Sequence, residues 1–572
     1  MNQRKTPSYR LDKDVAQPTV RSHSRFRWWD YPIFALLTAL HLTVLGFVLY
    51  HWITGTDWSQ THSIFLVLLG TVLIEFVIWE WRWLALPLMR VPRTMPAASG
   101  WRIAAAVTFV PDAESIEMLE ETVRAIIAIE YPHDTWVLDE GDDRAVRDLC
   151  ERLGARHFSR RHMPRYQAES GPFKTRTKYG NYNSWLSQHG YEHYDLVVAF
   201  DSDHIPRPDY LNQVLGYFDD ESVAYVQPAQ AYYNQNVSFI ARAAAEETYA
   251  YYSSIQMTHF AVGYPILVGC HNTHRVTALR QIGGFAAHEA DDMVMTLYYR
   301  AHGWRGVYVP QILARGITPV DWIGYLRQQR RWARSVLDFK LRVLPRYAAQ
   351  LPLLERVLSY VHGIYYLRGP VTALRILLLL SMLETSIAPK GFGLWFLGYT
   401  AAIWLTVILC DFYRQRFFLD PTSELGLHWR SGLVAFLKWP YFVLAFGDSI
   451  RGNYGSYTIT SKTRRPATPR GFAVTHGVVF LLVASAWTIN FLRGPTEFLA
   501  LHIATGFTSI TSLVAVITAL RQFPPPYQPG SRRFWNEWQF PVSSGSRMDL
   551  PPVLLRSSLP QGRVMENADT QI

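Results

Sequence analysis

The stretch Leu196-Val197-Val198-Ala199-Phe200-Asp201-Ser202-Asp203 says most about the fold of this chain. Five apolar residues in a row are typical of a strand that is buried on both faces of a parallel sheet. In open α/β sheets, ligands bind beyond the carboxyl ends of the strands. We therefore expect Asp201 and Asp203 to lie at a binding edge, although a solvated turn at the end of a strand also accounts for an Asp-x-Asp pattern taken alone.

The sequence on both sides of this strand has the texture of an α/β domain. Between residues 101 and 345, short apolar runs alternate with helical patterns, which predicts a parallel α/β sheet. A first strand is expected at 102–110, its helix at 116–129 and a second strand at 135–138. Asp139 follows that second strand, so another carboxylate is expected at the binding edge.

The composition indicates that the rest of the chain is membrane-bound. Hydrophobic residues make up 49% of the 572 residues and charged residues only 18%, which is below the usual quarter for soluble domains. Residues 31–56 and 391–410 contain no Lys, Arg, Asp or Glu, and each stretch is long enough to cross the roughly 30 Å hydrocarbon layer. With four further apolar stretches, six transmembrane helices are predicted: 31–56, 63–83, 371–387, 391–410, 472–489 and about 498–520.

The distribution of Lys and Arg predicts the orientation of these helices. Basic residues gather in residues 1–30 and 411–470 and are missing from 55–62, so the termini and the α/β domain are expected on the cytoplasmic side. The net charge of +10 lies mainly beside the predicted helices. Anionic lipid explains it there, and no nucleic-acid partner is expected.

Two further polar motifs follow the Asp-x-Asp pattern. Asp291-Asp292 precedes a helical stretch that ends at Gly303-Trp304; helix capping is the structural alternative to a catalytic role. Gln328-Gln329-Arg330-Arg331-Trp332 would suit an amphipathic helix on anionic lipid. Equally, Arg331 could bind a diphosphate through paired hydrogen bonds and Trp332 could stack on a sugar ring.

Two other features leave alternatives open. Cys270, His271 and His274 stand close in sequence, but a zinc site would need a fourth ligand, and none is evident. Glu75 is an acid within the second predicted transmembrane helix. It would face either a cavity or a polar partner on a neighbouring helix.

The order of these motifs resembles that of a known enzyme family. Asp139, Asp201-x-Asp203, Asp292 and Gln328-x-x-Arg331-Trp332 are similar to the D, D-x-D, TED and QxxRW series of family-two processive glycosyltransferases. Lys178-Tyr179-Gly180-Asn181-Tyr182-Asn183 looks like the K-A-G-N-x-N motif of that family, and Tyr457-Thr458-Ile459-Thr460-Ser461-Lys462 like the F-x-V-T-x-K gating loop of cellulose synthases. The resemblance covers roughly residues 101–465 and includes hyaluronan and chitin synthases.

The chain departs from the family pattern at three places. Pro111-Asp112-Ala113-Glu114-Ser115 stands where the family has P-x-Y-N-E, and Ala290-Asp291-Asp292 replaces Thr-Glu-Asp. Counting back from Gly303-Trp304 assigns the catalytic position to Asp292. Gly269-Cys270-His271-Asn272-Thr273-His274 replaces small apolar residues, so a different acceptor pocket is expected.

The resemblance implies a fold and a set of roles. The fold is a nucleotide-sugar-binding α/β domain of the GT-A, Rossmann-like type, inserted between transmembrane helices. Asp292 would be the catalytic base, and Asp201 and Asp203 would hold Mg²⁺ or Mn²⁺. The residues expected to bind the nucleotide sugar are Asp139, Lys178, Asp201, Arg331, Thr460 and Lys462. Gln328 and Trp332 are expected to bind the acceptor.

The resemblance also implies a function and a domain order. The expected reaction adds sugar from a UDP-sugar to a growing β-linked glycan, and the gating loop favours UDP-glucose. The enzyme is expected in the plasma (inner) membrane. Accessory subunits for export are candidate partners. A single transfer to a lipid acceptor is the alternative. The expected parts are a basic N-terminus 1–30, two transmembrane helices within 31–88, the glycosyltransferase domain 101–345, a membrane and interfacial region 346–520 with the gating loop 455–465, and a tail 521–572.

Overall fold

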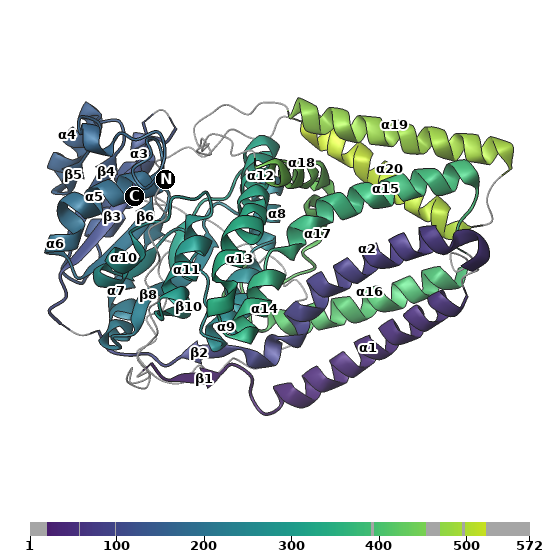
Figure 1. Ribbon diagram of the computed structural model, residues 1–572, viewed down its shortest axis with the longest axis horizontal. Helices are drawn as coiled ribbons and strands as arrows, with labels where there is room; N and C mark the ends of the chain where they lie inside the picture. Colours follow the sequence, from purple (N-terminus) through teal and green to yellow (C-terminus); the bar gives the residue numbers. More distant parts are fainter. Residues whose placement is uncertain are drawn as a thin grey trace, which may run out of the picture. The chain divides into compact units, whose positions relative to one another are not determined.

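The structure is a computed structural model that describes residues 20–55, 58–97, 99–111, 113–389, 394–452, 469–494 and 498–521. All of these residues belong to one unit of the chain, Met1–Tyr527. It combines an α/β domain with a group of long helices (Figure 1).

An eight-stranded sheet forms the centre of the α/β domain, in the order β5-β4-β3-β6-β9-β8-β10-β7. The strand β3 pairs in parallel with β4 on one side and with β6 on the other, which confirms the strands expected at 102–110, 135–138 and 196–200. The strands are β3 (Ile103–Phe109), β4 (Asp134–Asp139), β5 (Arg156–Phe158), β6 (Leu196–Asp201), β7 (Ile205–Pro206), β8 (Val223–Tyr232), β9 (Asn272–Arg275) and β10 (Arg305–Gly316).

The sheet is mixed, whereas the sequence pattern predicted a parallel one. β9 runs antiparallel to both β6 and β8, and β7 runs antiparallel to β10. Between β8 and β9 the chain forms the helices α8 (Phe239–Glu246) and α9 (Gln256–Ala261). The connection is therefore long enough for a parallel pair, and its length does not explain the antiparallel direction of β9.

Helices cover both faces of the sheet, because alternate side chains of each strand point to opposite faces. On β3, Ala104 and Ala106 pack on one side, while Ala105 and Val107 pack on the other. The helices of this domain are α3 (Ile116–Ile127), α4 (Arg144–Leu153), α5 (Lys178–Trp185), α6 (Tyr191–His193), α7 (Tyr210–Val214), α8 (Phe239–Glu246), α9 (Gln256–Ala261), α10 (Val276–Ile282), α11 (Asp291–Ala301), α12 (Trp322–Asp338) and α13 (Leu344–Tyr347).

Side-chain caps set where the helices that carry motifs begin. Thr177 accepts a hydrogen bond from the Gly180 amide, so α5 starts at Lys178. Asp321 accepts one from the Gly324 amide at 2.7 Å, so α12 starts at Trp322. Such caps satisfy backbone donors that have no partner within the helix.

Within the described residues, five helices are long and apolar enough to cross a membrane: Asp30–Thr54, Thr61–Leu88, Leu353–Thr385, Arg470–Arg493 and Leu499–Leu520. All five coincide with predicted transmembrane helices. The corresponding elements are α1 (Asp30–Thr54), α2 (Trp58–Leu84), α14 (Leu353–Val361) with α15 (Arg368–Thr385), α19 (Arg470–Arg493) and α20 (Leu499–Leu520).

Two further helical elements belong to this region. α16 (Leu394–Gln415) overlaps the transmembrane helix predicted at 391–410, but among the described residues it is not one of the five helices found apolar enough to cross a membrane; it packs against α1. α17 (Trp429–Leu437) and α18 (Trp439–Arg451) are bent by 50° against each other and together are apolar enough to make one broken membrane segment. The sequence pattern did not predict this bent pair as a membrane segment.

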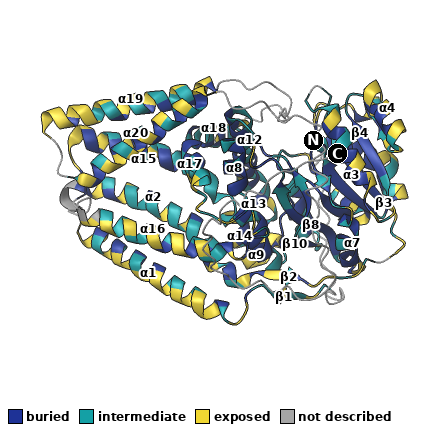
Figure 2. Ribbon diagram, turned by 180° about the vertical axis from the view of Figure 1, so that it is seen from behind, coloured by how far each residue is buried: buried dark blue, intermediate teal, exposed yellow. Residues whose placement is uncertain are grey.

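The exposed faces of the long helices are apolar, as lipid contact requires. Leu36 is 70% exposed, Leu481 62% and Ile510 64%. Figure 2 shows the exposed residues along α1, α16 and α19, in contrast to the buried strands of the sheet. Water would make this arrangement costly, whereas a bilayer would not.

Candidate active site

The end of β6 and the start of α5 bring a carboxylate and a lysine together. Lys178, the first residue of α5, forms an ion pair with Asp201, the last residue of β6, and its ammonium group also donates to the carbonyl of Gly269. Burial opposes the charge of Lys178, but the neighbouring Asp201 carboxylate outweighs it and raises the lysine pKa well above its ordinary value. Both groups line the same cavity.

Asp203 lies in the turn after β6 and is buried. Its Oδ1 lies 2.9 Å from Nδ1 of His204. One ligand atom from each of Asp201, Asp203 and His204 can lie within 4.8 Å of the others. Two carboxylates at this spacing fit a hard divalent cation such as Mg²⁺ or Mn²⁺.

Asp291 and Asp292 form the first turn of α11 and are turned towards the same cavity. Oδ1 of Asp292 accepts a hydrogen bond from the Met293 amide at 2.7 Å. Burial and the adjacent Asp291 carboxylate raise the pKa of Asp292 to about 7. A carboxylate with a pKa in this range can act as a base near neutral pH.

Gly269 lets the backbone approach Asp292 closely. A Cβ at position 269 would lie 3.4 Å from Oδ2 of Asp292, and the residue has φ of +78°. A side chain here would be strained by the backbone conformation and would press on the carboxylate. The segment that departs most from the family pattern therefore lies directly against Asp292.

Helix α12 contributes Gln328, Arg331 and Trp332, which all line this cavity. The neighbouring Gln329 also lines the cavity; it is largely buried and accepts a hydrogen bond from Lys438 at 2.8 Å. The structure therefore brings together seven residues expected at the site from four motifs: Lys178, Asp201, Asp203, Asp292, Gln328, Arg331 and Trp332.

Asp139 does not line the cavity. Its carboxylate is fully buried and accepts hydrogen bonds from the amides of Gly141 and Asp143, at 2.8 and 2.5 Å. The next residue, Glu140, does line the cavity and forms an ion pair with the buried Arg160. Asp139 thus shapes the loop after β4.

Thr460, Lys462 and the gating loop 455–465 lie outside the described residues.

The cavity has a volume of about 1500 Å³ and reaches from the sheet edge into the long helices. At one end it is lined by Lys178, Asp201 and Asp292, and at the other by Trp79 of α2 and Trp404 of α16. Further lining residues from the long helices are Val48, Leu379, Ala504 and Phe507. Charged and apolar walls thus belong to one continuous space.

Glu75 satisfies both alternatives that the sequence left open. It lines the cavity, and its Oε2 accepts hydrogen bonds from Arg368 of α15 at 2.9 and 3.1 Å. Arg375 lies 3.8 Å from the other carboxylate oxygen. The polar partners are two arginines from a distant part of the chain, a pairing that no local pattern could indicate.

Several buried polar residues near the site were missed by sequence reasoning. Lys438 forms hydrogen bonds with Glu247 and Tyr325, at 2.6 and 3.0 Å, besides Gln329. Tyr325 and Gln329 lie in α12, Glu247 directly follows α8, and Lys438 directly precedes α18. Because these residues are far apart in the sequence, no local pattern indicates the network. His204 and Gln230 also line the cavity. The position of His204 directly after the Asp-x-Asp pattern was a usable signal.

The chain is similar to proteins of known type. Residues 104–335 match the model of a family described as "Glycosyltransferase like family 2". The chain is 25% identical over 282 residues to the cellulose synthase 1 catalytic subunit [UDP-forming] of Komagataeibacter xylinus, and 26% identical over 319 residues to cellulose synthase 1 of the same organism. These matches span 47% and 52% of this chain but only 36% and 19% of the relatives' length.

Solved structures give weaker similarities. The mannosyltransferase PcManGT from Pyrobaculum calidifontis matches with a TM-score of 0.45 and 14% identity, covering 68% of this chain and 99% of that one. Glucosyl-3-phosphoglycerate synthase from Mycobacterium tuberculosis matches with a TM-score of 0.29 and 15% identity, covering 44% and 81%. Residues 104–335 are therefore similar to a family 2 glycosyltransferase domain, and the chain is similar to bacterial cellulose synthases over about half of its length.

Proposed function

We propose that this protein is a processive, inverting glycosyltransferase of the plasma (inner) membrane that adds sugar from a UDP-sugar, with UDP-glucose favoured, to a growing β-linked polysaccharide. One observation carries the proposal. A single cavity joins the charged groups at the sheet edge to aromatic and apolar side chains of the long helices. Such a space suits a donor at one end and an emerging glycan at the other, since sugar rings pack on aromatic faces.

In the proposed reaction, the Asp292 carboxylate accepts the proton of the acceptor hydroxyl. The hydroxyl oxygen then forms a bond to the anomeric carbon, while the bond from that carbon to the diphosphate oxygen breaks and its electron pair leaves with UDP. The pKa of about 7 for Asp292 supports this role. Attack opposite the leaving group inverts the anomeric centre.

The other cavity residues have matching roles in the proposal. Asp201 and Asp203 would hold Mg²⁺ or Mn²⁺, which would supply positive charge for the departing diphosphate. Lys178 and Arg331 would bind the diphosphate, with Thr460 and Lys462 closing over it. Trp332 and Gln328 would position the acceptor sugar, and Asp139 would act on nucleotide binding through the loop that it supports.

The proposal includes a membrane topology. The helices that flank the α/β domain are apolar enough to span the bilayer, and Lys and Arg gather beside the domain. We place the α/β domain in the cytoplasm, where nucleotide sugars are made. In this topology the glycosyltransferase domain 101–345 lies between the membrane segments 31–88 and 346–520. Export subunits would be the partners on the opposite side.

A single transfer to a lipid acceptor is the second candidate function. It is favoured by the aliphatic part of the cavity wall, where Val48, Leu379 and Leu501 would suit a lipid chain as well as a glycan. The glycosyltransferase domain itself is compatible with either acceptor. The two candidates differ in the size and solubility of the product.

The test uses the full chain in proteoliposomes with labelled UDP-glucose, UDP-N-acetylglucosamine and GDP-mannose offered separately. Polymer synthesis predicts that label from UDP-glucose enters water-insoluble or high-molecular-weight product that a β-glucan hydrolase of defined linkage degrades. Asp292→Asn is the inactive control. Label confined to the organic extract would instead establish the lipid acceptor, and incorporation from none of the donors would overturn both candidates.

A further inference from the structure

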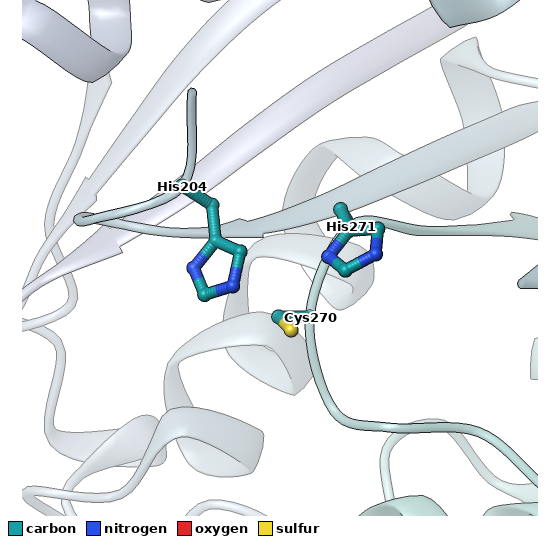
Figure 3. Close-up of side chains that lie close together, drawn as sticks. All are labelled: His204, Cys270 and His271. Carbon is teal, nitrogen blue, oxygen red and sulfur yellow. The ribbon is translucent and has the colours of Figure 1, made fainter. Parts of the chain in front are cut away.

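Three metal-ligating side chains converge beside the proposed active site. His204 follows β6, while Cys270 and His271 precede β9. All three are buried, and one ligand atom from each lies within 4.8 Å of the others. Figure 3 shows the two imidazole rings and the thiol turned towards a common space. His274, which the sequence grouped with Cys270 and His271, instead bonds to Asn272 and Tyr299.

The hydrogen bonds of His204 set the tautomer of its ring. Nδ1 lies 2.9 Å from the Asp203 carboxylate, which can only accept when ionised, so Nδ1 carries the proton. Nε2 then keeps its lone pair, which faces Nε2 of Gln230 at 3.1 Å, and a metal bound there would replace that amide nitrogen as its partner. A carboxylate behind a ligating histidine is the usual arrangement at metal sites, because it fixes the tautomer and orients the ring.

His271 shows the same preparation from the opposite side. Its Nε2 lies 3.3 Å from the carbonyl oxygen of Pro228, so Nε2 donates and Nδ1 keeps a lone pair. Nδ1 is buried without a hydrogen-bond partner among the described residues. The residue also has φ of +36°, an uncommon backbone conformation for a non-glycine residue. A bound metal would give this buried nitrogen the partner that it lacks in the described part of the chain.

Gln230 provides a fourth donor atom. Its Oε1 accepts a hydrogen bond from Sγ of Cys270 at 3.1 Å, and its Nε2 lies 3.1 Å from Nε2 of His204. The amide therefore sits between two of the three candidate ligands. Gln230, His204 and Cys270 all line the cavity, which gives an ion a path to them.

We propose that His204 Nε2, Cys270 Sγ and His271 Nδ1 bind one zinc ion, with Oε1 of Gln230 as the fourth ligand. Imidazole and thiolate donors in a four-ligand site favour Zn²⁺, whereas Mg²⁺ requires oxygen ligands. Tetrahedral zinc separates its N and S ligands by roughly 3.3 to 3.7 Å. The ligand atoms of the three residues lie within 4.8 Å of one another and move closer on binding, and the Cys270 thiol releases its proton to solvent.

The zinc site goes beyond the proposed sugar transfer and has a structural role of its own. It ties the turn after β6 to the loop before β9. That loop contains Gly269, whose carbonyl accepts from Lys178 and whose Cα lies against Asp292. Zinc therefore holds the turn that carries Asp201 and Asp203 at a set position relative to Asp292. Asp203 belongs to that turn and also orients His204.

The experiment measures metal binding by the purified full chain in detergent, without reference to activity. After equilibration with Zn²⁺ and gel filtration in excess Mg²⁺, we expect one zinc per chain by mass spectrometry. Replacement with Co²⁺ should give the intense thiolate-to-cobalt absorption of a tetrahedral site. Cys270→Ser should abolish that absorption and weaken zinc binding at least tenfold. Cys150→Ser, at another buried free cysteine, is the matched control and should change neither.

His271→Asn is the second variant, because Asn tolerates positive φ better than most residues; it should lose zinc in the same way. The wild-type cobalt spectrum needs no variant to fold. Failure of the wild type to retain zinc, or retention that Cys270→Ser leaves unchanged, would overturn the site. Displacement of all zinc by Mg²⁺ would assign binding to Asp201 and Asp203 instead. None of these readouts depends on whether sugar is transferred.

Discussion

At the scale of single residues, the site is built around carboxylates whose surroundings differ. Asp201 is paired with Lys178, whereas Asp292 is buried next to Asp291 and has its pKa raised to about 7. Groups with such different surroundings can share a cavity and take different roles. These unlike surroundings support the proposed roles, in which Asp201 contacts the cation and Asp292 accepts the proton.

Replacement of Asp292 by Asn should separate catalysis from stability. We expect transfer to fall at least about 100-fold, since general-base catalysis contributes on this order, while UDP binding measured by calorimetry stays within a few-fold. Because burial raises the folded pKa of Asp292, ionisation costs stability progressively as pH rises from the unfolded value towards 7. The free energy of unfolding of the variant should therefore exceed that of wild type at pH 8 by roughly 1–3 kcal/mol. The gain should be smaller at pH 5.

Retained turnover in this variant would exclude Asp292 as the base. Asp203→Asn is the companion variant: it should weaken donor binding that depends on Mg²⁺ or Mn²⁺, and with it the activity. Equal loss of donor binding in both variants would contradict the division of roles.

The pH profile should report the Asp292 environment. The base works only when ionised, so kcat/KM should fall as pH is lowered through about 7, approaching tenfold per pH unit. The Asp291 carboxylate helps to raise this pKa, and Asp291→Asn should move the acidic limb to lower pH. An unshifted limb in a folded variant would mean that another group controls it.

At the scale of elements, α12 links the site to the bent pair α17 and α18. Gln328, Arg331 and Trp332 of this helix line the cavity, while its Tyr325 and Gln329 form hydrogen bonds with Lys438. The buried ammonium of Lys438 also meets Glu247, at 2.6 Å. The position of α12 therefore depends on residues that lie more than a hundred positions away along the chain.

Removal of the Lys438 charge alone should destabilise the protein more than removal of the charges of both Lys438 and Glu247. Lys438→Met leaves Glu247 without its cationic partner, and we expect a destabilisation of about 3 kcal/mol, measured by thermal melting in detergent. The double variant Glu247→Gln with Lys438→Met should recover a large part of it. Arg124→Ala, which breaks the exposed pair with Glu120, is the control and should cost less than about 1 kcal/mol. Additive losses in the double variant would refute the coupling.

At the scale of the whole described unit, the cavity connects the two parts of the protein. Its charged end is formed by the sheet edge and its apolar end by α1, α2, α15, α16 and α20. If a glycan grows through it, a large side chain in the apolar end should stop elongation without touching the chemistry.

Ala504→Trp tests this idea. Ala504 lines the cavity on α20, so we expect the product to become several-fold shorter while UDP release in the first turnovers continues. Size-exclusion analysis of labelled product gives the length. Ser485→Trp, at an exposed position of α19 away from the cavity wall, should have no effect. Unchanged product length in Ala504→Trp would count against passage of the glycan along this wall.

The segment around Thr460 and Lys462 carries a separate prediction. If it closes over the donor and excludes water, replacement of both residues with Ala should lower polymer output at least about tenfold, which corresponds to about 1.4 kcal/mol of transition-state stabilisation. Membrane expression and melting temperature should remain near wild type. Normal output from a stably expressed double variant would contradict the gating role and favour a single-transfer enzyme.

The sequence by itself determined the features that depend on local pattern. The apolar run 196–200 predicted a buried strand, uncharged stretches predicted long helices, and ordered motifs predicted the residues that line the cavity. The tertiary structure alone decided which distant groups meet. It made β9 antiparallel, enclosed Asp139 in its own loop, paired Glu75 with Arg368, and brought His204 to Cys270. Local periodicity reports which face of an element is buried, whereas such pairings depend on how the buried faces pack, which no short window of sequence contains.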